Sequence, residues 1–354
     1  MSLLHRLIHQ SSCSHNLRAI PCLSNSRSSA IRPSLYQNHS TIAHSATPEV
    51  HQDQSGCLYK VDKVLKEVPF PPHLVSLASC EEQKVILKYI HPANFEDLED
   101  INRKLRGASH VRLPRDTIPD KSMFVFDYFT GHLLRLTQED LPLSVTKRIL
   151  KDALMGLAEL HGQDIVHTDI KADNVFVNWK RNGDEILIDK VQLGDLEDAA
   201  HMPPGSAMIG KQAGNWMWRS PEAHARGPVN KPSDIFSCAL VCIYAIHKRV
   251  IFAVGDDELK PGLERLALVI ERQMPYFADN DSVDGFLAHL GDNPWAEVFQ
   301  VTRDGFDKEH PRTPFALWDN VDEDFRSLIC AMACFDPAKR ITASEALAHR
   351  WFDV

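Results

Sequence analysis

The feature that most constrains the fold of this 354-residue chain is a polar stretch at residues 167–174, HTDIKADN, set between a predicted helix and a predicted strand. Further charged landmarks follow in a fixed order: Asp195 in GDLE, Glu222 in RSPE, Asp234 in PSDIFS and Arg340 in DPAKRIT. A single His-x-Asp is a weak signal, because Asp is common in turns and helix caps. Four landmarks in order are a far more specific signal than any one of them.

Around these landmarks the residue pattern changes from strand-like to helical. Short apolar runs predict five strands in the first part of the chain, at 59–68, 74–78, 84–90, 111–113 and 123–126. Helical spacing predicts helices at 94–106, 133–138 and 142–161, and a hairpin at 175–192 turns around Asn182-Gly183. From Pro232 onward the sequence indicates helices and loops. We expect an α+β fold with a small β-rich lobe containing one helix, then a larger α-helical lobe.

The order of landmarks resembles the catalytic core of the eukaryotic protein kinases, in which H-R-D-x-K-x-x-N, D-F-G and A-P-E follow one another. The resemblance covers about residues 58–354. It implies the bilobal protein-kinase fold, with a small lobe at about 58–128 and a large lobe at about 129–354. The stretch at 214–245 looks most like a group of fungal single-domain kinase-like proteins. The family uses ATP and Mg²⁺, so the resemblance implies both.

The resemblance assigns roles to four residues of the large lobe. Asp169 matches the catalytic aspartate, and Lys171, two residues on, would neutralise the γ-phosphate. A lysine at that position fits the Ser/Thr kinases rather than the tyrosine kinases. Asn174 and Asp195 match the two metal-holding positions and supply the oxygen ligands that Mg²⁺ prefers.

The small lobe leaves alternatives open. Lys88 in VILK is our match for the strand lysine that grips the α- and β-phosphates, and Lys66 in VLKE is the alternative. Two predicted strands precede Lys88, as the kinase order requires, so Lys88 is favoured. Its glutamate partner on the following helix would be Glu99, with Glu96 as the alternative.

Other positions match the hinge and the scaffold of the kinase fold. The backbone of Asp127 and Phe129 would meet the adenine ring. Glu222 would pair with Arg340 inside the large lobe. Asp234 would accept hydrogen bonds from the backbone that precedes Asp169.

The sequence also departs from the kinase pattern. No glycine occurs between Gly56 and Gly107, so the glycine-rich phosphate loop is absent and its place falls at 69–73, PFPPH. Proline has no N–H to offer a phosphate, so we expect weaker binding of the nucleotide phosphates on that side.

Glu197 replaces the glycine of D-F-G. Thr168 replaces the arginine that reads a phosphate on the activation loop in many kinases, so we expect activity without such phosphorylation.

These observations support two leading functions. The first is an Mg-ATP-dependent protein kinase that transfers the γ-phosphate to Ser/Thr hydroxyls of a protein substrate. The alternative is a pseudokinase that acts as a nucleotide-binding or protein-interaction module. It is supported by the altered phosphate loop and by the sequence Asp195-Leu196-Glu197 in place of D-F-G. A phosphotransferase for small molecules is less well supported, because the landmarks around Glu222, Asp234 and Arg340 belong to protein kinases.

Composition excludes several other classes. A net charge of −9 and a pI near 6.0 disfavour a nucleic-acid binder, and the longest uncharged apolar stretch, 235–246, is too short to span a membrane. The eight cysteines include no CxxC pair. Pairs spaced four apart, Cys238/Cys242 and Cys330/Cys334, indicate buried packing rather than a metal site. We expect a monomer.

The first 50 residues differ in character from the rest. Residues 1–48 contain four arginines and no lysine, Asp or Glu, so the −9 of the chain divides into +4 here and −13 in the remainder. Leu3, Leu4 and Leu7 surround Arg6, as in an amphipathic basic helix. This composition is typical of a mitochondrial transit peptide. The alternative is a serine-rich disordered tail on a cytoplasmic protein.

Fusing residues 1–48 to a fluorescent reporter tests the targeting hypothesis. We expect a mitochondrial signal because the segment is basic and free of acids. Changing its four arginines to glutamine should abolish that signal. A diffuse cytosolic signal from the unaltered fusion would contradict mitochondrial delivery.

Overall fold

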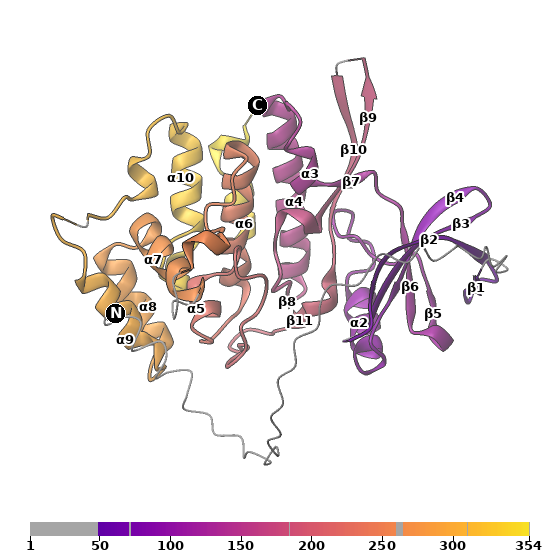
Figure 1. Cartoon of the computed structure of the whole chain (residues 1–354), viewed down its shortest axis with the longest axis horizontal. Helices are drawn as coiled ribbons and strands as arrows, with labels where there is room; N and C mark the ends of the chain where they lie inside the picture. Colours follow the sequence, from indigo (N-terminus) through magenta and orange to yellow (C-terminus); the bar gives the residue numbers. More distant parts are fainter. Residues whose placement is uncertain (1–48, 71, 184, 260–264, 310, 354) are drawn as a thin grey trace, which may run out of the picture.

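The computed structural model describes residues 49–70, 72–183, 185–259, 265–309 and 311–353, which form two lobes (Figure 1). A β-sheet with one helix makes the N-terminal lobe, and helices make most of the C-terminal lobe, as the sequence predicted. Residues 1–48, which carry the predicted leader, lie outside the described residues, so targeting stays a prediction. Among the described residues, no helix has the length and apolar character needed to cross a membrane.

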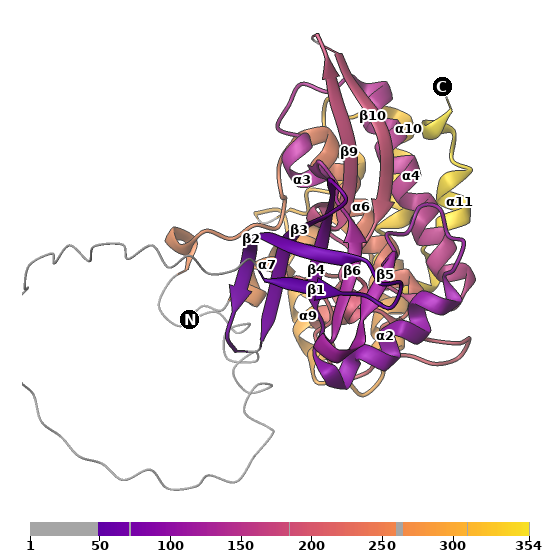
Figure 2. The same ribbon diagram turned by 90° about the vertical axis from the view of Figure 1, so that its right-hand side faces the viewer.

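The N-terminal lobe is built on a six-stranded antiparallel sheet with the order β1-β2-β3-β4-β6-β5. Its strands are β1 (Val50–Gln52), β2 (Leu58–Val68), β3 (His73–Cys80), β4 (Gln83–Tyr89), β5 (Asp116–Ile118) and β6 (Met123–Asp127). Helix α2 (Pro92–Lys104) lies beside the sheet in Figures 1 and 2. The ring of Phe95 on α2 packs 4.8 Å from that of Phe124 on β6.

Strand β4 shows how the sheet divides its side chains between core and cleft. Val85 and Leu87 are buried in the small-lobe core with Tyr59 and Val125. Because successive side chains of a strand point to opposite faces, Lys88 lies on the other face, towards the second lobe. Strand alternation therefore fixes the side of the sheet on which this lysine can act.

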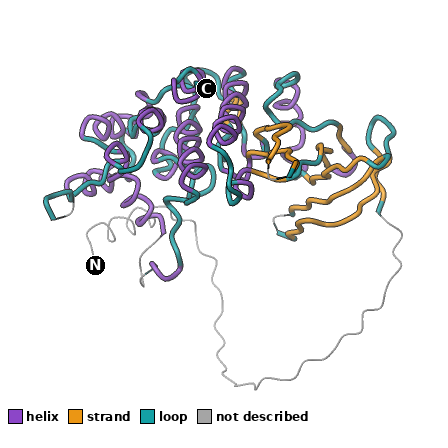
Figure 3. The backbone as a smooth tube through the Cα atoms, turned by 90° about the horizontal axis from the view of Figure 1, so that it is seen from above, coloured by secondary structure: helices purple, strands orange, loops and turns teal. Residues whose placement is uncertain are grey.

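The C-terminal lobe packs around helix α6 (Lys231–His247), which is buried along nearly its whole length. This helix contains the uncharged apolar stretch 235–246. Helices α4 (Leu143–Gly162) and α10 (Glu323–Met332) pack against it. Figure 3 shows the helices gathered at one end of the molecule and the strands at the other. The remaining helices are α3 (Leu133–Leu136), α5 (Pro221–His224), α7 (Arg265–Phe277), α8 (Asn280–Leu290), α9 (Trp295–Asp304) and α11 (Ala343–Leu347).

Two small sheets of the C-terminal lobe position the polar landmarks. The predicted hairpin is confirmed as β9 (Val175–Asn182) and β10 (Glu185–Leu193), and β7 (Gly131–His132) pairs with β9. Strand β8 (Ile165–Val166) pairs with β11 (Ala200–His201). The stretch 167–174 runs from β8 to β9, so it is anchored by a strand at each end.

Two expectations about strands and lobe boundaries were wrong in detail, and one covalent bond was not foreseen. The strand predicted at 111–113 does not join the sheet; Val111 instead forms a single parallel bridge with Leu193, and β5 begins at Asp116. The small lobe begins before residue 58, because β1 starts at Val50 and pairs with β2. Cys57 and Cys80 form a disulfide that the sequence did not reveal. Cys238, Cys242, Cys330 and Cys334 are free. The first two are buried as predicted, whereas Cys330 and Cys334 are only partly buried, so the prediction of buried packing was wrong for that pair.

A buried ion pair ties two distant segments of the large lobe together. The Arg340 guanidinium donates to both carboxylate oxygens of Glu222, at 2.5 and 2.9 Å, and the two side chains are almost completely buried. Arg340 also donates to the carbonyls of Cys334, Pro232 and Phe335. The predicted pair is therefore confirmed, and its bidentate geometry gives the guanidinium a full set of acceptors.

Arg340→Ala should lower the free energy of unfolding by about 3–5 kcal/mol, because it leaves the Glu222 carboxylate buried and unpaired. Denaturant unfolding measures this. The matched control is Arg181→Ala, which breaks an exposed pair with Glu139 and should cost less than about 1 kcal/mol. Equal losses in the two variants would contradict a structural role for the buried pair.

Candidate active site

A cavity of about 430 Å³ lies between the lobes, a volume typical of small-ligand sites. Lys88 from β4 lines it on the side of the sheet. Asn174 and Asp195 line it on the side of the large lobe, and Phe129 lies in the chain segment that joins the lobes. The structure therefore brings to one cavity four residues that the sequence assigned to phosphate, metal and adenine, whereas Asp127, Asp169 and Lys171 are not among the described lining residues.

The Lys88 ammonium group contacts two carboxylates that follow β10. It forms an ion pair with Asp195 and a second, at 2.8 Å, with Glu197. Burial alone would lower the pKa of Lys88, but the two carboxylates outweigh it and hold that pKa above its usual value. Lys66, the alternative from the sequence, is an exposed residue of β2 that also lines the cavity. Lys88 is thus the lysine in contact with Asp195.

Asp195 is positioned by its backbone as well as by Lys88. Its φ of 67° lies in the left-handed region, which is uncommon for a residue other than glycine. Burial raises the pKa of its carboxyl, yet the charges of Lys88 and Lys171 prevail and keep that pKa below its usual range. The carboxylate is therefore ionised at neutral pH, as a metal ligand must be.

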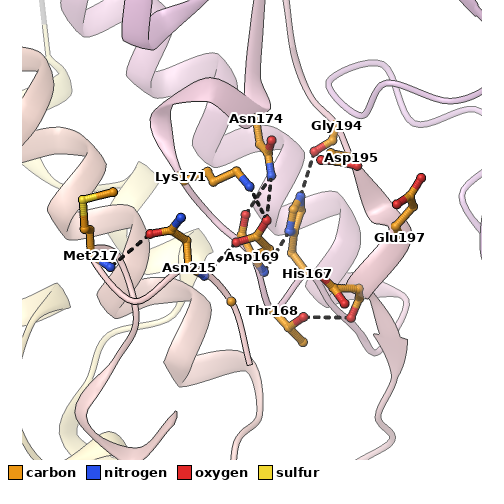
Figure 4. Close-up of polar contacts among 12 residues, drawn as sticks. His167, Thr168, Asp169, Lys171, Asn174, Gly194, Asp195, Glu197, Asn215 and Met217 are labelled. Carbon is orange, nitrogen blue, oxygen red and sulfur yellow. Dashed lines mark hydrogen bonds and ion pairs between the residues drawn. The ribbon is translucent and has the colours of Figure 1, made fainter. Parts of the chain in front are cut away.

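Asp169 is held by donors from three directions (Figure 4). Lys171 Nζ lies 2.5 Å from its Oδ2, and the backbone N–H of Asn215 donates to its Oδ1 at 2.9 Å. Asn174 Nδ2 donates to the backbone carbonyl of Asp169 at 2.9 Å. With Nδ2 used in this way, Oδ1 of Asn174 is the atom available as an oxygen ligand. Asp169, Lys171 and Asn174 thus form one hydrogen-bonded unit.

His167 connects this unit to Asp195. Its Nδ1 accepts the backbone N–H of Asp169 at 3.3 Å, so its Nε2 carries the proton and donates to the Gly194 carbonyl at 3.0 Å. The ring is completely buried. His167 therefore fixes the distance between the two loops that hold Asp169 and Asp195.

Asp234 holds the backbone of the loop that contains Asp169. Its carboxylate accepts the backbone N–H groups of His167 at 2.7 Å and Thr168 at 2.9 Å, as predicted. Thr168 has a φ of 65°, and its hydroxyl donates to the Asp198 carbonyl at 2.7 Å. Thr168 brings no positive charge to this position, so nothing at this residue would pair with a phosphate on the activation loop.

Gly214 allows the activation loop to approach closely. Its φ is +78°, and a Cβ there would lie 2.4 Å from the Thr168 carbonyl oxygen. Only glycine fits without a shift of the backbone. This contact places the next residue, Asn215, against Asp169.

The predicted partner of Lys88 on α2 is corrected by the structure. Neither Glu99 nor Glu96 is among the described ion-pair partners of Lys88, and Glu197 occupies that role. Leu98 and Asn102 are the α2 residues that line the cavity. Glu99 lies about 100° around the helix from Leu98 and about 60° from Asn102, and it is not among the residues that line the cavity. The described contacts therefore assign the role of Lys88 partner to Glu197 and not to Glu99.

The glycine-free loop lies where the sequence placed it. Between β2, which ends at Val68, and β3, residues 69, 70 and 72 are described as turn, and His73 begins β3 and lines the cavity. The Phe70 side chain is 89% exposed in this turn. The turn therefore places prolines and an aromatic ring where kinases of the usual pattern place glycine N–H groups.

Sequence reasoning missed several cavity residues. Arg112 is buried, and its Nη2 donates to the Asp127 carbonyl at 2.7 Å. His132 also lines the cavity, and its Nδ1 has no hydrogen-bond partner among the described residues. A charged residue inside the apolar run Val111-Arg112-Leu113 is a signal that could have marked Arg112.

Comparison with known proteins supports the same fold and family. A family model of the protein kinase domain matches residues 83–352. Calcium/calmodulin-dependent protein kinase type II of Caenorhabditis elegans is 28% identical over 272 residues, which cover 75% of this chain and 31% of that protein. Cyclin-dependent kinase 4 of Xenopus laevis is 29% identical over 264 residues, 72% of each.

A solved structure agrees with these relatives. A chain of the yeast RNA Pol II CTD kinase CTDK-1 complex superposes with a TM-score of 0.65 at 17% identity, covering 90% of this chain and 97% of that one. At this identity the likeness concerns the fold alone. The family match, by contrast, spans most of the chain and includes every landmark from Lys88 to Arg340. This chain belongs to the protein kinase family.

Proposed function

We propose that the chain is an Mg²⁺-dependent Ser/Thr protein kinase that uses ATP, the donor expected from the family, on a hydroxyl group of a protein substrate. The observation that carries the proposal is the Asp169 unit. One carboxylate oxygen contacts Lys171 and the other accepts the Asn215 N–H. Lys88 and Asp195 meet in the cavity that Asn174, which is hydrogen-bonded to Asp169, also lines. Phosphoryl transfer needs mainly this positioning and charge neutralisation.

Each charged residue of the site would have a separate role in phosphoryl transfer. Asp169 would orient the incoming hydroxyl and accept its proton. Lys171, whose pKa is held above its usual value by Asp169 despite partial burial, would neutralise the transferred phosphoryl group. Lys88 would hold the α- and β-phosphates from the sheet side. The lysine two residues after Asp169 supports a Ser/Thr rather than a Tyr acceptor.

The donor set of Asn174 and Asp195 fits Mg²⁺. One carboxylate and one amide oxygen at the mouth of a phosphate site match the way this ion is bound, with one or two protein ligands plus substrate phosphates. When bound, Mg²⁺ supplies charge neutralisation across the phosphates. The ion pair of Asp195 with Lys88 keeps its carboxylate ionised for this purpose.

A pseudokinase is the second candidate, and the β2–β3 turn favours it. Proline has no N–H, so the turn at 69–72 has fewer donors for phosphates than a glycine-rich loop. A chain that binds nucleotide weakly and transfers nothing would fit that turn. The experiment that follows separates the two functions.

Asp169→Asn should reduce labelled-phosphate transfer to a generic acceptor protein by about 100- to 10,000-fold, because the proton acceptor is lost. It should preserve the thermal shift produced by Mg-ATP. Asp195→Asn should abolish the Mg²⁺-dependent part of that shift, because a metal ligand is neutralised. Wild-type protein that gives a Mg-ATP shift but no transfer would establish the pseudokinase. No shift that depends on Asp195 would overturn nucleotide binding by this site.

Glu197→Gln should make Lys88 more reactive. Loss of one carboxylate lowers the pKa of Lys88, and labelling by acetic anhydride at pH 8 should rise by up to about tenfold, the change expected per unit of pKa. Mass spectrometry of the peptide that contains Lys88 measures this. Glu99→Gln is the matched control and should leave labelling unchanged. Increased labelling of Lys88 in Glu99→Gln but not in Glu197→Gln would instead identify Glu99 as its carboxylate partner.

A further inference from the structure

The pairing of strands β2 and β3 shifts by one residue beside the cavity. Val64 lies opposite Ser76, which is buried. Lys66, two residues further along β2, lies opposite Val75, only one residue away in β3, so Leu65 is an extra residue, as in a β-bulge. Because side chains alternate between the two faces of a strand, the shift moves Lys66 from the face of Ser76 to the face of Val75. Lys66 and Val75 both line the cavity.

Lys66 lies in one row with the lysine that contacts Asp195. Val75 lies opposite Lys66 on one side and opposite Lys88 on the other. Two strand spacings therefore separate the two lysines, about 10 Å between their backbones. His73 lies two residues before Val75 in β3, so its side chain is on the same face, and it also lines the cavity. One face of the sheet thus presents two lysines and a histidine to the cavity.

The side chains of Lys66 and His73 have donors available to a ligand. Within the part of the chain that the structure describes, neither side chain forms a hydrogen bond or an ion pair, whereas Lys88 contacts two carboxylates. Burial and the charge of Lys66 lower the pKa of His73, and the carboxylates of Asp195 and Glu197 oppose this without outweighing it. The ring is therefore neutral at neutral pH and carries one N–H.

We propose that Lys66 and His73 bind the nucleotide phosphates from the side of the sheet and supply part of the contact that the turn between β2 and β3 lacks. The inference rests on the proposed nucleotide-dependent function and extends its phosphate site. Phosphate oxygens are negatively charged acceptors, which suit an ammonium group and a ring N–H. Lys66, the alternative to Lys88 in the sequence, is then a second phosphate-binding residue. Two side chains offer fewer donors than a glycine-rich loop, so this side of the site stays the weaker one.

Equilibrium binding of Mg-ATP and of adenosine to the full chain tests the proposal. Lys66→Met keeps an apolar stem and removes the charge, so it should weaken Mg-ATP binding by about tenfold. His73→Phe keeps a ring without the N–H and should weaken it by about 3- to 10-fold. Both variants should bind adenosine as wild-type protein does, because adenosine has no phosphate.

Lys63→Met is the matched control for loss of charge. Lys63 is another exposed lysine of β2, but it is not among the residues that line the cavity. Its loss should leave the binding of both ligands unchanged. Equal weakening of Mg-ATP binding in Lys63→Met and Lys66→Met would overturn the proposal, because the effect would then come from net charge alone.

Chemical protection of wild-type protein gives a second test that does not depend on folding of a variant. Acetic anhydride should label Lys66 more slowly with saturating Mg-ATP than without nucleotide, because the phosphates would cover its ammonium group. Labelling of Lys63 should not change, and mass spectrometry distinguishes the two lysines. Labelling of Lys66 that is unaffected by saturating Mg-ATP would contradict its role.

Three outcomes separate this inference from the proposed function. If wild-type protein and both variants bind Mg-ATP equally, Lys66 and His73 do not bind the phosphates, while the nucleotide site is retained. If the variants lose adenosine and Mg-ATP binding to the same extent, the two residues only shape the cleft and phosphate recognition is overturned. If wild-type protein binds neither ligand, the proposed function fails and this inference fails with it.

Discussion

The active site depends on one buried carboxylate that makes no contact with the cavity. Asp234, at the start of the buried helix α6, accepts the backbone N–H groups of His167 and Thr168 and also contacts the ring of His161. These bonds satisfy two donors that the loop leaves unpaired when it turns at Thr168. Because Asp169 follows at once, the position of its carboxylate, the proposed proton acceptor, is set by the helix. A buried helix thus holds the loop that carries the candidate site.

Each of the two lysines of the candidate site lies beside at least one carboxylate. Lys88 lies between Asp195 and Glu197, and Lys171 contacts Asp169. Each lysine therefore carries its own counter-ion before any phosphate arrives. In the proposed function a nucleotide would compete with these carboxylates for the lysines, and Asp195 would hold Mg²⁺, whose charge would reduce that competition. The extra carboxylate of Glu197 would make the competition stronger than a glycine at the same position.

Landmarks of fixed spacing could be predicted from the sequence, and contacts that depend on tertiary packing could not. Asp169, Lys171 and Asn174 occupy one short loop, so their residue types define their site. Lys88 followed from counting the strands that precede it. Glu99 was the wrong partner because Lys88 pairs with Asp195 and Glu197, a contact between segments far apart in the sequence that spacing within α2 does not reveal. Arg112 was missed because its role arises from a bridge to Leu193 and from rings contributed by other segments.

The turn at 69–72 has a consequence for the lifetime of the bound nucleotide. A glycine-rich loop closes over phosphates with several N–H groups, and those bonds must break before the nucleotide leaves. Here prolines and an exposed Phe70 replace them, so fewer bonds oppose departure. Since affinity differences arise mostly from dissociation rates, we expect short residence of the nucleotide and rapid exchange with the solution. The nucleotide that occupies the cleft would then be set by the ratio of nucleotides in solution, and a product would not be retained.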